Sequence, residues 1–142
     1  MNIFYVGSIL LGLVLGAGAS VQATGQQIKP SASAQGNAEA GRSLFNGKGV
    51  CYYCHGMDGY RGKLPQLEAD TAALIARLNP PPSDLRNSKR LHLKNDKQRA
   101  KAVREGHPGT GMFPDTTMTN QELVDTLAYL TLLRAEGSAA RK

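Results

Sequence analysis

The chain has 142 residues and a formal net charge of +6, with 20% charged and 41% hydrophobic residues, an ordinary composition for one globular domain. It contains only two cysteines, Cys51 and Cys54, which excludes a disulfide scaffold. Aromatic residues make up 6% and Trp is absent, so a large apolar cofactor would add much to so modest a core.

The positive charge is concentrated between Arg86 and Arg104. This segment holds eight basic residues and one acidic residue, Asp96, whereas the rest of the chain holds nine basic and ten acidic residues. The eight are Arg86, Lys89, Arg90, Lys94, Lys97, Arg99, Lys101 and Arg104. Such a segment suits nucleic acid, anionic lipid or an acidic protein face, or it is a solvated helix surface. Because no nucleic-acid-binding motif accompanies it, we exclude nucleic acid as the partner.

Residues 1–23 are predicted to be an export signal. Residues 9–16 form an apolar stretch of the length of a signal-peptide core, and Val21-Gln22-Ala23 offers a small-x-small cleavage site before Thr24. A rival site follows Ala19. The segment before the apolar stretch has no Lys or Arg, so an uncleaved membrane anchor stays open as the alternative. Either reading exports the remainder, and we expect a periplasmic location.

Residues 24–36 are rich in Gln, Ser, Ala and Gly and are predicted to form a flexible linker. The folded domain is predicted to span residues 37–135. Asn37 can cap a first helix over residues 38–45, and the glycines that follow would end it.

Three further helices are expected. Asp70 can cap a short helix that Pro80-Pro81-Pro82 must stop. Asn95 can cap another, with Gly106 at its C-terminal end. The last helix begins with a Thr-x-x-Glu capping box, carries leucines at helical spacing, and gives way to a basic tail over residues 136–142 that we expect to be disordered. No segment alternates as strands do, so the sequence predicts an all-α fold.

The strongest chemical signal is Cys51-Tyr-Tyr-Cys54-His55. Two thiols at Cys-x-x-Cys spacing can each add to one haem vinyl group, and the adjacent His can then reach the iron. A thioredoxin-like site expects a βαβ setting that this chain lacks. A zinc site needs four ligands; His92 and His107 could complete the set, but they form no second clustered pair.

From about Asn37 to Ala135 the chain resembles class I cytochrome c. Four pieces carry the resemblance, in the order the family has them. They are Gly41-x-x-x-Phe45, the Cys51 to His55 motif, Leu64-Pro65-Gln66-Leu67 as the family's Pro-x-Leu, and Gly109-Thr-Gly-Met-Phe-Pro114 followed by Leu127-Ala-Tyr-Leu130 in the last helix.

This resemblance implies a fold in which the first and last helices cross around a covalently bound haem. Gly41, Phe45 and Tyr129 match the helix contact, whereas Thr126 stands where an apolar residue is usual, so a looser crossing is expected. It also implies that the backbone carbonyl of Pro65 accepts a hydrogen bond from the ring of the ligand His55, which fixes the ring's orientation.

Met112 is the predicted second iron ligand. Met1 lies in the export segment, and Met57 is too close to His55 to reach the opposite haem face. Met118 precedes the Thr-x-x-Glu cap and is expected to form a hydrophobic staple. Met112 lies in a Gly- and Pro-rich loop, and the haem motif and the resemblance favour it as a ligand. The competitors are His107, close to the same loop, and His92, which is expected to be solvated.

With His and Met bound, the iron has no open position. The sequence therefore predicts a mono-haem electron carrier rather than an enzyme, working between exported or membrane-bound redox partners, of which one presents an acidic docking face to the basic segment. Two alternatives remain: a haem enzyme or gas sensor with a labile sixth ligand, and an electron-entry subunit of an oxidoreductase complex.

Overall fold

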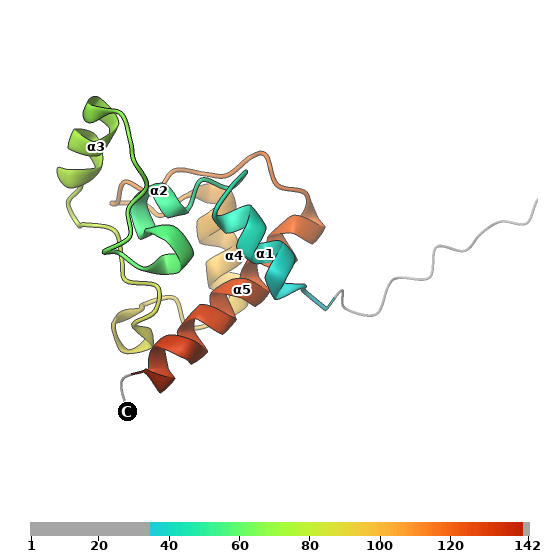
Figure 1. Ribbon diagram of the computed structural model, residues 1–142. Coiled ribbons are helices and arrows are strands. Elements are labelled where there is room, and N and C mark those ends of the chain that lie inside the picture. The colour runs from blue at the N-terminus through green and yellow to red at the C-terminus, as the bar shows by residue number, and fades with distance from the viewer. Residues whose placement is uncertain (1–34, 141–142) are drawn as a thin grey trace, which may run out of the picture. The chain divides into compact units, whose positions relative to one another are not determined.

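The computed structural model describes residues 35–140, and in this range it is helical without strands (Figure 1). The helices are α1 (Ala38–Phe45), α2 (Tyr52–His55), α3 (Ala69–Ala76), α4 (Asp96–Glu105) and α5 (Asn120–Ala139), with the 3₁₀ turns η1 (Met57–Gly59) and η2 (Ser88–Arg90). The predicted all-α fold is confirmed. The predicted export signal and most of the predicted linker lie outside the described residues. Within the described part, no helix has the length and apolar character needed to cross a bilayer.

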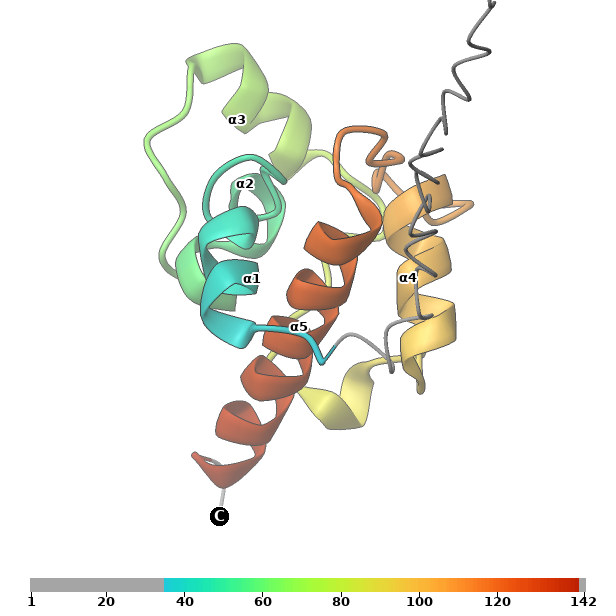
Figure 2. The ribbon, with the colours of Figure 1, turned by 90° about the vertical axis from the view of Figure 1, so that its right-hand side faces the viewer.

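The crossing of α1 and α5 forms the centre of the fold, and Figure 2 shows α5 between α1 and α4. Phe45 and Tyr129 meet edge to face, with ring centroids 5.5 Å apart, and together with Leu133 they form the buried core. Thr126 is 1% exposed, and its hydroxyl donates to the Glu122 carbonyl within the helix, 2.8 Å away. The looser crossing expected from Thr126 is therefore not found, because the helix itself satisfies the hydroxyl.

Gly41 sets how closely the two helices approach. A Cβ at Gly41 would lie 2.0 Å from the Asp125 carbonyl oxygen, a contact that only movement of a helix backbone can relieve. Asp125 also accepts a hydrogen bond from the Asn37 backbone N–H at 2.8 Å, which ties the start of α1 to α5.

We expect Gly41→Ala to lower the free energy of unfolding by about 1–3 kcal/mol, because overpacking outweighs the higher helix propensity of Ala. Gly62→Ala is the matched control, since a Cβ there meets nothing within 4 Å. Urea denaturation of the two variants measures the difference. If Gly41→Ala had the same denaturation midpoint as the control, α1 and α5 could move apart to admit the Cβ without loss of stability.

Local capping signals placed three helix starts correctly. Asn37 accepts hydrogen bonds from the first turn of α1, Asn95 accepts one from the Gln98 N–H at 2.9 Å, and Thr119 and Glu122 form the predicted reciprocal capping box. The prediction for Asp70 is wrong. Helix α3 begins at Ala69, so Asp70 lies in its first turn, and no side chain caps it.

The prediction that disorder begins at residue 136 is also wrong, because α5 continues to Ala139. Its last turns pack on the segment that follows Leu85. Arg86 forms an ion pair with Glu136 at 3.0 Å, and Ser88 and Ser138 share a hydrogen bond of 2.9 Å. Gly137 is buried so closely against Arg86 that no larger residue fits.

Asp58 joins three parts of the fold behind the Cys-x-x-Cys-His segment. Its carboxylate accepts hydrogen bonds from Arg42 and Asn46 near α1 and, at 3.0 Å, from the Tyr129 hydroxyl on α5. The hydrogen bond from Arg42 is the main cause that holds the pKa of Asp58 well below its usual range. This network anchors the segment directly after His55 to the helix crossing.

Candidate cofactor site

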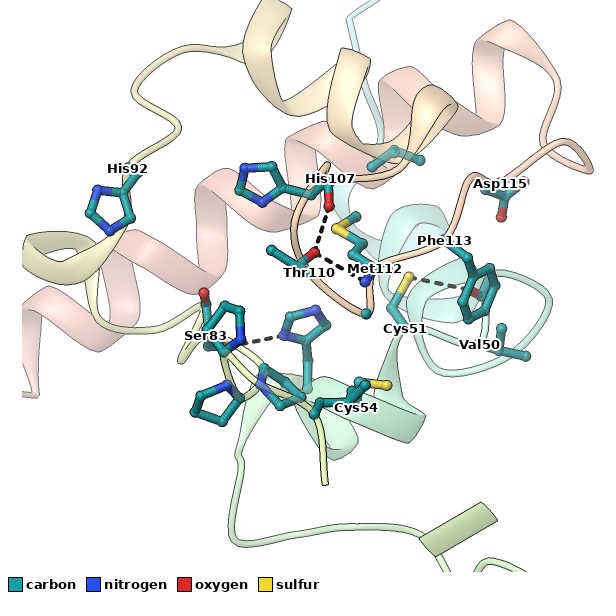
Figure 3. Close-up of a pocket in the computed structure, with 18 residues that line it drawn as sticks. Val50, Cys51, Cys54, Ser83, His92, His107, Thr110, Met112, Phe113 and Asp115 are labelled. Carbon is teal, nitrogen blue, oxygen red and sulfur yellow. Dashed lines mark hydrogen bonds between the residues drawn. The ribbon is translucent and has the colours of Figure 1, made fainter. Parts of the chain in front are cut away.

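Two adjoining cavities, of about 250 and 110 Å³, lie between α2, α4, α5 and the loop after α4. They are lined mostly by apolar side chains. The residues that line both are Cys51, His55, Ser83, His92, Val103, His107 and Met112. Figure 3 shows this site, with Cys51 and Cys54 on one side and His92 on the opposite side. The structure thus gathers side chains from distant parts of the sequence around one space.

The single turn of α2 places both cysteines at this site. Cys51 precedes the turn and Cys54 lies within it, and both are free thiols that are half-buried. Burial raises the pKa of Cys51 to about 12 and also raises the pKa of Cys54, so both stay protonated at neutral pH. Forming two thioether bonds requires two S–H groups, because each thiol adds across one vinyl double bond of the haem.

His55 is held by a backbone carbonyl. Its Nδ1 lies 2.9 Å from the Ser83 oxygen, which can only accept, so Nδ1 carries the proton and donates (Figure 3). The other ring nitrogen, Nε2, therefore keeps its lone pair for a metal. Burial lowers the pKa of His55, although the bond to Ser83 opposes this, so the neutral ring is favoured.

The predicted carbonyl role of Pro65 is wrong, because Ser83 fills it. Pro65 is not among the residues that line either cavity. Two Pro-to-Leu stretches follow the cysteine motif, Pro65-Gln-Leu67 and Pro82-Ser-Asp-Leu85. Leu85 packs against the core and so brings the second stretch to the site. The run of three prolines before Ser83 was the signal in the sequence that could have pointed to the Ser83 carbonyl as the acceptor for His55.

Met112 is the one described methionine that lines the cavities (Figure 3). Its loop is closed by hydrogen bonds: the His107 N–H donates to the Met112 carbonyl at 3.0 Å, and the Met112 N–H donates to the Thr110 hydroxyl at 3.1 Å. Met118 is instead buried elsewhere, at 4% exposure, with its sulfur 3.7 Å from the Thr126 hydroxyl.

Both competing histidines also line the cavities. His107 does so from the start of the Met112 loop, and His92 does so although it is largely exposed, as expected from its place in the basic segment. Among the described residues, no cluster of three or more His, Cys, Asp or Glu could hold a bare metal ion. The donor set of two thiols, a directed imidazole and a thioether in an apolar space fits a haem instead.

The comparisons with known proteins agree with this chemistry. Residues 38–133 match the family model described as Cytochrome c. No match was found among curated proteins or among solved structures. The family binds haem c covalently through Cys-x-x-Cys-His, and Cys51, Cys54 and His55 are spaced as that motif requires. Because the match covers well over half of the chain, this protein belongs to the class I cytochrome c family, with haem c as its covalent cofactor.

Proposed function

We propose that the protein is a mono-haem electron carrier and not an enzyme, with His55 and Met112 as the two axial ligands of the iron. The observation that carries the proposal is that His55, turned by Ser83, and Met112 line the same cavity, whereas Met57 and Met118 do not. The bound haem supplies one-electron chemistry at its iron. Two protein ligands leave no position for a substrate, so the protein's part is to hold those ligands and exclude water.

Carbon monoxide tests this proposal on the wild-type protein. The reduced carrier is expected to resist carbon monoxide, because Met112 occupies the sixth position. Rapid binding would instead favour a haem enzyme or gas sensor with a labile ligand. Purification as a stable complex with an oxidoreductase would assign the protein as an electron-entry subunit.

We further propose that the protein is exported, by cleavage of residues 1–23 or with that segment retained as an anchor. Export to the periplasm accords with covalent haem attachment in this family. The N-terminal sequence of the mature protein separates cleavage before Thr24 from a retained anchor, and a mature protein recovered from the cytoplasm would contradict both.

The basic segment is proposed to dock an acidic face of a redox partner. The structure narrows the set of side chains that can do so, since Arg86 is 8% exposed and Arg104 donates to the carbonyls of Met118 and Thr119. Arg99 is turned inward as well, with its side chain 12% exposed. The exposed basic residues of the segment are Lys89, Arg90, Lys94, Lys97 and Lys101.

We expect the double variant Lys94→Glu and Lys97→Glu to slow electron transfer with the physiological partner roughly tenfold at low salt, because rim charges act on the rate of encounter. Stopped-flow rates at increasing ionic strength should fall for the wild type and converge with those of the variant. Lys63→Glu, an exposed lysine outside the segment, is the control. If neither ionic strength nor charge reversal changes the rate, the segment is a solvated surface and not a docking site.

A further inference from the structure

Two arginines line the smaller cavity, whose lining is otherwise mostly apolar. Arg99, in α4, and Arg134, in α5, both line it, and neither lines the larger cavity. The aliphatic part of the lining includes Leu91, Leu93 and Leu130. Two guanidinium groups facing an apolar cavity are costly unless an anion joins them there.

The neighbouring groups offset this charge only in part. Arg99 donates to one carboxylate oxygen of Asp96, at 3.0 Å from Nε and 2.6 Å from Nη2, and from Nη1 to the Leu93 carbonyl at 3.2 Å. Arg134 donates to the neutral hydroxyl of Thr131 at 2.9 Å. Burial first, and then the charge of Arg99, lower the pKa of Arg134, although the carboxylate of Asp96 opposes this shift. The two cations therefore lie close enough to repel each other.

The arginines line the smaller cavity, and the pair of cysteines is displaced toward the larger one. Cys54 lines only the larger cavity and Cys51 lines both, whereas Arg99 and Arg134 line only the smaller one. His92, which lines both cavities, lies opposite Cys51 and Cys54 in Figure 3. A haem has its two vinyl groups on one edge of the ring and its two propionate carboxylates on the opposite edge. A vinyl edge held at Cys51 and Cys54 would therefore turn the carboxylates away from Cys54 and toward the smaller cavity, which the arginines line.

We propose that Arg99 and Arg134 bind the propionate carboxylates of the haem. The proposal rests on covalent haem attachment at Cys51 and Cys54 in the orientation just described. Arginine presents a planar fork of donors that matches a carboxylate, and partial burial strengthens each charge-assisted hydrogen bond. The two cations then hold the carboxylates in their charged form and shield the iron from that negative charge, which favours the reduced state.

The test is resonance Raman spectroscopy of the holoprotein, in which the propionate bending mode reports hydrogen bonding to the carboxylates. We expect Arg99→Gln and Arg134→Gln each to shift this mode to lower frequency and to lower the reduction potential. The mass added by the covalently bound haem and the absorption bands that report the axial ligands should stay unchanged. Arg77→Gln is the control, because Arg77 is exposed and lines neither cavity.

Arg134→Lys separates hydrogen bonding from charge. The lysine keeps the positive charge but not the fork, so the mode should shift while the potential stays close to that of the wild type. Propionate modes that are unchanged in both glutamine variants would overturn the proposal, and a shift in only one would overturn a pair of binding arginines. Loss of covalent haem from the wild-type protein, visible in its mass, would instead refute the attachment on which the proposal rests.

Discussion

Met112→Ala is expected to abolish the weak near-infrared sulfur-to-iron absorption of the oxidised protein and to let the reduced protein bind carbon monoxide. A thioether favours reduced iron more than imidazole or water does, so the reduction potential should also fall, by on the order of 0.1 V. The backbone of the loop should survive the change, because its hydrogen bonds to His107 and Thr110 use main-chain atoms of Met112. Near-infrared absorption and redox titration measure the two effects.

Met118→Leu is the matched control for this experiment. Met118 is 4% exposed and packs beside Thr126, so its truncation to Ala would cost about 2–5 kcal/mol rather than the small loss of a staple contact. The volume-conserving Leu should cost less than about 1.5 kcal/mol and leave the spectrum intact. If the absorption survives in Met112→Ala and disappears in Met118→Leu, the assignment of the ligand is reversed.

The double variant Cys51→Ala and Cys54→Ala is expected to lose all covalently bound haem. Each thioether uses one thiol, and both cysteines line the cavity as free thiols, so each single variant should retain one bond and give a reduced yield of holoprotein. The intact mass and extraction with acidified acetone measure attachment. Tyr53→Phe, between the two cysteines, should keep both bonds. Haem that resists extraction from the double variant would place its attachment elsewhere.

What the sequence predicted correctly depended on neighbouring residues. Asn37, Asn95 and Thr119 cap helices through hydrogen bonds that span two or three positions, so the local sequence defines them. The cysteine motif is similarly local, because one turn of helix brings Cys51, Cys54 and His55 together. Such features can be predicted without knowledge of how the chain folds back on itself.

What the sequence did not predict depends on tertiary contacts. Asp58 joins α1 to α5 through Tyr129, which is 71 positions away, and its role cannot be seen from its neighbours in sequence. The charge count treated Arg86 as part of a surface patch, whereas it is buried against Glu136. The disordered tail was predicted in error for the same reason. The last turn of α5 packs on the segment after Leu85 through Glu136 and Ser138, contacts between residues 50 positions apart.

The three prolines before Ser83 bear on how little the protein must rearrange when an electron arrives. Each proline has a fixed φ, so the segment Pro80–Pro82 has few conformations to lose on folding and few to adopt afterwards. These restricted residues limit how far the carbonyl of Ser83, the acceptor for the His55 ring, can move. A ring that keeps one orientation in both oxidation states spares the protein a reorganisation cost at each transfer, as fixed dipoles do in a preorganised site.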